Sequence, residues 1–85
     1  MNFEILKSYP VINSTIIIKL FDNTIYTIEN VSETELQISN SVKMIIKGDI
    51  NKTIIICPGY IRYICEQTDI IINYSDILKC IIRKS

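Results

Sequence analysis

The residue types that usually carry out enzymatic chemistry are scarce in this chain. None of its 85 residues is histidine, which removes the usual general base and the commonest metal ligand. A Ser-His-Asp or Cys-His arrangement is therefore impossible within the chain. The two glycines, Gly48 and Gly59, are too few for a phosphate-binding glycine loop. The sequence predicts a protein that is not an enzyme and that uses no cofactor.

Three cysteines are the remaining candidates for metal or redox chemistry. Cys57, Cys65 and Cys80 have spacings that match neither a zinc ribbon nor a redox pair. Cys57 and Cys65 flank Pro58-Gly59 and could face each other across a hairpin, but an odd number of cysteines argues against a disulfide framework. All three alternate in step with apolar neighbours. We expect them to be small buried hydrophobic residues, and we predict no metal site.

Several carboxylates lie close together in the sequence. Glu33 and Glu35 flank a polar stretch, Glu66 and Asp69 bracket a possible turn, and Asp76 follows a serine. Paired carboxylates can carry out acid–base catalysis or bind a cation. Nothing in the sequence brings these pairs together, and turns favour acidic residues in any case. We interpret them as solvated turn residues.

The segment from Pro58 to Tyr63 is the best candidate for a binding site. Alternation along a strand places Tyr60 and Arg62 on one face and Tyr63 on the other. A guanidinium beside an aromatic ring can stack on a base, and it can hold a phosphate or carboxylate. The sequence therefore predicts that these three residues contact a ligand or partner. The alternative is a surface ion pair between Arg62 and Glu66, with the tyrosines at the rim of the core.

Lys43, Lys47 and Lys52 form the one local basic cluster, around the turn at Gly48. Lys43 and Lys47 share a strand face, and Lys52 could reach the same edge. Two roles are open for this cluster. It could receive an anion, or it could protect an exposed sheet edge from pairing with another chain.

These candidates must be positioned by strands. Apolar residues recur with a period of two from residue 15 onward, and 22 isoleucines with no alanine favour strand over helix. We expect Leu36 and Ile38 to point inward on their strand. A short helical turn is expected near Ser75–Leu78. The expected strands cover residues 15–20, 24–29, 35–39, 42–47, 53–57, 60–66, 70–74 and 78–82, with a further edge strand at 3–7.

The turns between these strands have recognisable residues. Pro58-Gly59 fits the central positions of a type II turn, because proline presets the first dihedral and glycine accepts a positive φ. Asp22-Asn23 fits a two-residue hairpin turn, and residues 67–69 are expected to turn again. The fold class is therefore all-β: about seven or eight short strands in a small antiparallel meander, closed as a barrel or packed as a sandwich. All 85 residues are expected to form a single domain.

The size of the chain favours self-association. A domain this short buries only about 60–65% of the surface that its unfolded chain exposes, and such domains often add a partner subunit. The predicted strands at 15–20 and 70–74 are apolar on both faces, so each is either central in a sandwich or covered by a second subunit. A net charge of zero removes one barrier to association. We therefore expect a homo-oligomer.

Charge and apolar patterning limit the partners. Nine basic and nine acidic residues make nucleic acid a less expected partner, because non-specific nucleic-acid binders are usually basic. No apolar run approaches the roughly 20 residues of a membrane span, and the first residues lack the pattern of a signal peptide. We expect a cytoplasmic protein with no membrane partner.

Together these observations predict a small non-enzymatic binding protein. The wealth of isoleucine, asparagine, lysine and tyrosine indicates an AT-rich genome, such as that of a bacterium, a phage or a virus. This suits a phage or viral accessory protein, a host-defence antagonist in the host cytoplasm. It would sequester a small anionic, nucleotide-like ligand or block a host protein. Two alternatives remain open: a nucleic-acid-binding small barrel using the three lysines and Arg62, and a structural subunit of a larger assembly.

Overall fold

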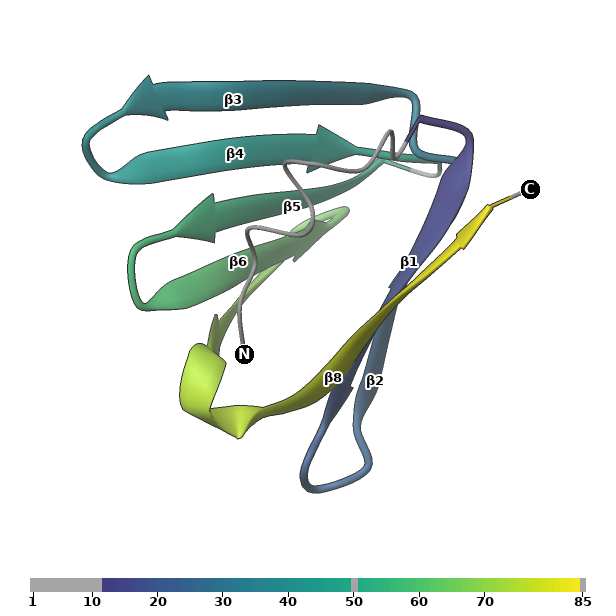
Figure 1. The fold of residues 1–85 in the computed structure, drawn as a ribbon, viewed down its shortest axis with the longest axis vertical. Coiled ribbons are helices and arrows are strands. Elements are labelled where there is room, and N and C mark those ends of the chain that lie inside the picture. The colour runs from purple at the N-terminus through teal and green to yellow at the C-terminus, as the bar shows by residue number, and fades with distance from the viewer. Residues whose placement is uncertain (1–11, 50, 85) are drawn as a thin grey trace.

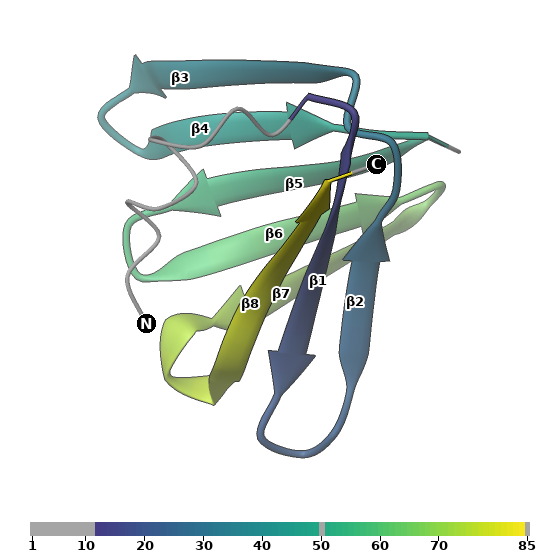
Figure 2. The same ribbon diagram turned by 45° about the vertical axis from the view of Figure 1, so that its right-hand side comes forward.

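Eight strands form two antiparallel sheets in the computed structural model, which describes residues 12–49 and 51–84 (Figure 1). The smaller sheet has the order β2-β1-β8 and the larger has the order β3-β4-β5-β6-β7. The strands of the smaller sheet run across those of the larger one (Figure 2). The strands are β1 (Ser14–Leu20), β2 (Ile25–Ile28), β3 (Glu33–Ser39), β4 (Val42–Lys47), β5 (Lys52–Cys57), β6 (Tyr60–Cys65), β7 (Thr68–Asn73) and β8 (Ile77–Lys84).

The expected all-β fold is confirmed, and the meander holds for the five-stranded sheet. From β3 to β7, each strand pairs with the next one along the chain. The expected helical turn is the 3-10 helix η1 (Tyr74–Asp76). After it the chain crosses to the smaller sheet, where β8 pairs with β1 from Ser14 opposite Lys84 to Leu20 opposite Ile77. The strand pairs fall into two separate sheets, so the architecture is a sandwich and not a closed barrel.

Isoleucine fills the space between the sheets. The inner face of the five-stranded sheet contributes alternate residues of its central strands, and the smaller sheet contributes Ile16, Ile18 and Ile28. Burying one such side chain stabilises a fold by about 1.5–3 kcal/mol, so the buried isoleucines hold the two layers together. The buried residues of the larger sheet include Met44, Ile46, Ile54, Ile56, Ile61, Tyr63 and Ile72.

One expected core residue is exposed. Leu36 lies opposite Met44 on the inner side of β3, as the alternation predicts, but 53% of it is accessible to solvent. The strand β3 is an edge strand, and a sheet of three strands does not cover a sheet of five. The inward direction predicted for Leu36 is confirmed by this register, but the side chain is not buried. The side chain of Ile38 and the expected edge strand at 3–7 lie outside what the structure describes.

The turns contain residues with the positive φ angles that tight turns need, although two of the turns differ in length from the prediction. Gly59 has φ 87°, as the second central position of a type II turn requires. Asn23 also has a positive φ, of 73°, but its connection spans residues 21–24 rather than two residues. The β6–β7 turn is made by Glu66, at φ 56°, and Gln67, so β7 begins earlier than predicted.

At Gly48, just after β4, the backbone of the larger sheet comes close to the backbone that follows β2. A Cβ atom at this position would lie 2.6 Å from the carbonyl oxygen of Glu29, just beyond β2. The same carbonyl accepts a hydrogen bond of 2.9 Å from the amide of Asp49. The close approach of the two backbones therefore requires glycine at position 48. Within residues 12–49 and 51–84, no helix has the length and apolar character to cross a membrane.

Candidate functional site

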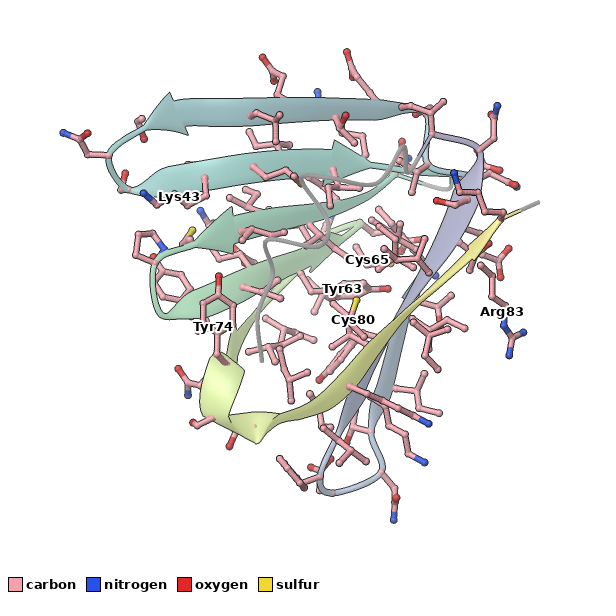
Figure 3. The ribbon with its side chains drawn as sticks, viewed as in Figure 1. Lys43, Tyr63, Cys65, Tyr74, Cys80 and Arg83 are labelled. Carbon is pink, nitrogen blue, oxygen red and sulfur yellow. The ribbon has the colours of Figure 1, made fainter. Side chains whose placement is uncertain are left out.

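The structure divides the Pro58–Tyr63 segment between the two faces of β6. Tyr63 is 7% exposed and lies between the sheets (Figure 3). Its hydroxyl donates to the carbonyl oxygen of Thr27 at 3.2 Å, and its ring centroid lies 5.0 Å from that of Tyr26. Tyr63 therefore links β6 to β2 within the core. The structure does not bring it together with Tyr60 and Arg62, which lie on the opposite, outer face.

The guanidinium of Arg62 is held by a carboxylate of the next strand. Its Nε donates to Oδ1 of Asp69 at 3.3 Å, and its Nη2 donates to Oδ2 of the same residue. These hydrogen bonds raise the pKa of Arg62 and lower the pKa of Asp69. The expected pairing of Arg62 with Glu66 is therefore wrong, because Glu66 forms the turn and Asp69 is the diagonal neighbour on β7.

Tyr60 lies beside Cys57 at the type II turn, where the two residues are cross-strand partners. A hydrogen bond with the Cys57 side chain is the main cause that raises the pKa of Tyr60. From the other side, the hydroxyl of Tyr74 in η1 donates to the carbonyl oxygen of Cys57. These contacts fix the end of the β5–β6 hairpin against the segment that leads to β8.

The three lysines around Gly48 do not form one patch. Lys47 lies 3.7 Å from Glu33 on the outer face, and Lys43 is exposed on that same face (Figure 3). Lys52 points to the inner side, where its Nζ donates to the carbonyl oxygen of Thr27 at 3.4 Å. The edge-protection role is wrong for Lys43 and Lys47, because β4 lies between β3 and β5 and is not an edge strand.

The cysteines are free thiols; Cys57 is 3% exposed, as expected of a small buried hydrophobic residue, and Cys65 and Cys80 are partly buried. The register sets Cys57 opposite Tyr60 and Cys65 opposite Lys52, so the two cysteines do not face each other. Cys80 packs against the core, where burial raises its pKa to about 11. Among the described residues, no three Cys, Asp or Glu side chains gather in a way that could hold a metal ion.

The outer face of the five-stranded sheet carries apolar residues, of which the sequence analysis anticipated only those of the strand at 70–74. Ile45, Ile55 and Ile64 are half-buried there, and Ile71 is 62% exposed. Ile45 lies directly opposite Ile55, and Ile71 lies opposite Arg62. Consecutive isoleucines in β4 and β5 were the available signal for Ile45 and Ile55, because alternation sends neighbours to opposite faces. We call this surface the five-stranded outer face; its charged residues are Glu33, Glu35, Lys43, Lys47, Arg62 and Asp69.

The outer face of the three-stranded sheet has a different character. It carries three cations, Lys19, Lys79 and Arg83, and Figure 3 shows Arg83 directed away from the body of the protein. These residues come from β1 and β8, which the sequence alone does not bring together. We call this surface the three-stranded outer face; it consists of Thr15, Ile17, Lys19, Ile25, Thr27, Lys79, Ile81 and Arg83.

Comparison of the chain with protein-family models, with curated proteins and with solved structures finds no match.

Proposed function

We propose that the chain is a non-enzymatic binding protein that works as a homo-oligomer, with the five-stranded outer face as the contact between subunits. The observation that carries this proposal is the group of four isoleucines on that face, one of them 62% exposed. An antiparallel sheet with one solvated face normally carries polar residues there. An apolar centre with charged residues around it is instead typical of a protein interface.

The charges of this face fit a second copy of the chain. Three cations and three carboxylates lie on it, so two copies that meet there do not repel each other. Lys47–Glu33 and Arg62–Asp69 are ion pairs within one subunit. Lys43 and Glu35 have no ion-pair partner among the described residues and are available to pair between subunits. A two-fold contact uses the same patch on both copies, which requires such self-complementary charges.

The oligomer is tested by introducing a carboxylate at each of two comparably exposed isoleucines. Native mass spectrometry and analytical ultracentrifugation of the wild type should show a closed oligomer. Ile71→Glu places a carboxylate in the proposed contact and should give a monomer. Ile25→Glu makes the same change on the other sheet, where Ile25 is 56% exposed, and should leave the oligomer intact. A wild type that is monomeric at all concentrations would contradict the proposal, as would dissociation of both variants alike.

If the oligomer binds a small anionic ligand, Tyr60 and Arg62 are the residues proposed to contact it. In that case, the phosphate or carboxylate of a nucleotide-like ligand replaces Asp69 as the acceptor for the Arg62 guanidinium. The same native mass spectra test it, because a retained ligand adds a small mass to each oligomer. That mass should be absent from Arg62→Ala; if it persists in this variant, Arg62 does not bind the ligand.

A further inference from the structure

The three-stranded outer face concentrates positive charge in a chain whose net charge is zero. Its eight positions include three cations and no carboxylate. Among the described residues, Lys19, Lys79 and Arg83 have no ion-pair partner. On the five-stranded outer face, by contrast, Lys47 and Arg62 each lie beside a carboxylate. Within the described part of the chain, ion pairs therefore do not neutralise the positive charge of the smaller sheet.

Two of these cations are placed in an arrangement that disfavours folding. Lys19 and Lys79 are direct cross-strand partners on adjacent strands. Like charges directly opposite each other in a sheet are destabilising. Residues that destabilise a fold, with no contact that compensates for them, are expected at functional positions. This pair therefore points to a role outside the stability of the sheet.

Apolar side chains lie beside the cations. Ile17 and Ile81 are cross-strand partners in the row between Arg83 and the lysine pair. Ile25, 56% exposed, lies opposite Lys19 on the other side. At the same end of the sheet the structure exposes Phe21 to 66% in the β1–β2 turn. The register shift between Lys19 and Leu20 leaves Leu78 as the extra residue of β8, and it is 45% exposed.

We propose that the three-stranded outer face docks an acidic protein surface. Apolar side chains with charges around them match the composition of protein interfaces, and complementary charge on the partner would neutralise the three cations. A second copy of the chain cannot meet this face with its own, because the two sets of cations would repel. Single-stranded nucleic acid is disfavoured because none of the eight positions is aromatic and one ring, Phe21, lies beside them in the β1–β2 turn, whereas such ligands are held by several stacked rings.

The size of the face predicts a weak, rapidly exchanging complex. Three strands with a spacing of about 4.8 Å and seven residues with a rise of about 3.4 Å give a flat area of roughly 14 × 24 Å. This is below the roughly 800 Å² per partner of a standard stable interface. Electrostatic attraction should therefore contribute a large share of the binding, and the affinity should fall as salt rises.

The proposal can be tested with a defined acidic probe, a dye-labelled 12-residue peptide of alternating glutamate and leucine. Fluorescence anisotropy at low salt should show binding to the wild-type protein. The double variant Lys19→Gln/Lys79→Gln should bind about tenfold more weakly, because two exposed ion pairs are lost. Its Tm should not fall, since the like-charge pair is removed as well. A loss of binding with an unchanged or higher Tm cannot come from unfolding.

A matched control separates this face from net charge. Asn40→Asp/Gln67→Glu changes the net charge by the same amount at two exposed turns of the other sheet, and should bind the peptide nearly as well as wild type. Three results would overturn the proposal: no binding by the wild type, equal losses in both double variants, or equal binding of a lysine–leucine peptide. A fourth would replace it. If an oligonucleotide of 20 thymidines binds more tightly than the peptide and Lys19→Gln/Lys79→Gln abolishes that binding, the partner is a phosphate polymer.

Discussion

The substitution Tyr63→Phe tests how the two sheets are joined. It removes one hydroxyl and keeps the ring, which lies 5.0 Å from the ring of Tyr26. The lost hydrogen bond to the Thr27 carbonyl is 3.2 Å long and partly buried. A hydrogen bond of this kind contributes about 0.5–1.5 kcal/mol net. Because Nζ of Lys52 still donates to the same carbonyl at 3.4 Å, the acceptor is not left unpaired, and we expect a loss of about 1 kcal/mol.

Thermal and urea denaturation measure this loss. For a domain of this size, about 1 kcal/mol lowers Tm by roughly 4–8 °C. The dependence of the unfolding free energy on urea concentration should not change, since the same surface is exposed on unfolding. Tyr26→Phe is the matched control. The described structure gives the Tyr26 hydroxyl no hydrogen bond, so its removal should change Tm by no more than about 2 °C.

The ring contact is measured separately by a double-mutant cycle. Tyr63→Leu and Tyr26→Leu each remove one ring of the pair, and the double variant removes both. We expect a coupling energy of about 0.5–1.5 kcal/mol between the two positions. The reasoning is refuted if Tyr63→Phe is as stable as wild type while Tyr26→Phe is destabilised. That result would mean that the inter-sheet hydrogen bond comes from the other tyrosine.

Three further predictions follow from single contacts. Gly48→Ala should destabilise the fold by about 1–3 kcal/mol, because the new Cβ would be overpacked against the Glu29 carbonyl. Gly59→Ala should cost less, about 1–2 kcal/mol, because its Cβ meets open space and only the positive φ is unfavourable. The opposite order of stabilities in urea denaturation would refute this. Arg62 lowers the pKa of Asp69 below its ordinary 3.8, so the ion pair stabilises the fold above that pH, and its contribution is lost as the pH falls through the lower pKa of the folded protein. Between pH 6 and 2, Tm should therefore fall less steeply in Asp69→Asn than in the wild type. Parallel curves of Tm against pH would contradict the pairing. Burial raises the pKa of Cys80 from 9.0 to about 11, which lowers the thiolate fraction at pH 8. Cys80 should therefore react with iodoacetamide about 100-fold more slowly in the folded protein than in guanidinium, as followed by peptide mass spectrometry. Equal rates would show that the thiol is exposed.

Local chemistry explains how much of the fold the sequence predicts. Pro58-Gly59 determines its own turn, because each residue restricts or extends the available φ. Alternation of apolar residues gives the strands from residue 33 to 73 with small errors at their ends. The pairing of β8 with β1 was not predictable in this way. It depends on the packing of two sheets, and no turn residue connects the two strands.

In the candidate site too, local patterns were predictable from the sequence and contacts between strands were not. Alternation correctly placed Tyr60 and Arg62 on one face of β6 and Tyr63 on the other. It did not show that Tyr63 would meet Tyr26, or that Asp69 would hold Arg62, because both contacts depend on registers between strands. The cations of the three-stranded outer face were overlooked for a related reason. Lys19 and Lys79 are far apart in the sequence, and only the β1–β8 register makes them neighbours.

The return of β8 to β1 has a consequence for biosynthesis. The five-stranded sheet contains only hairpins between consecutive strands, so it can begin to form while the chain is still being synthesised. The smaller sheet must wait, because Ser14 pairs with Lys84. Until β8 leaves the ribosome, the edge of β1 that pairs with β8 remains open, and such an exposed strand edge attracts chaperones or aggregates. Completion of β8 is therefore the step at which the smaller sheet of the nascent chain is fully paired.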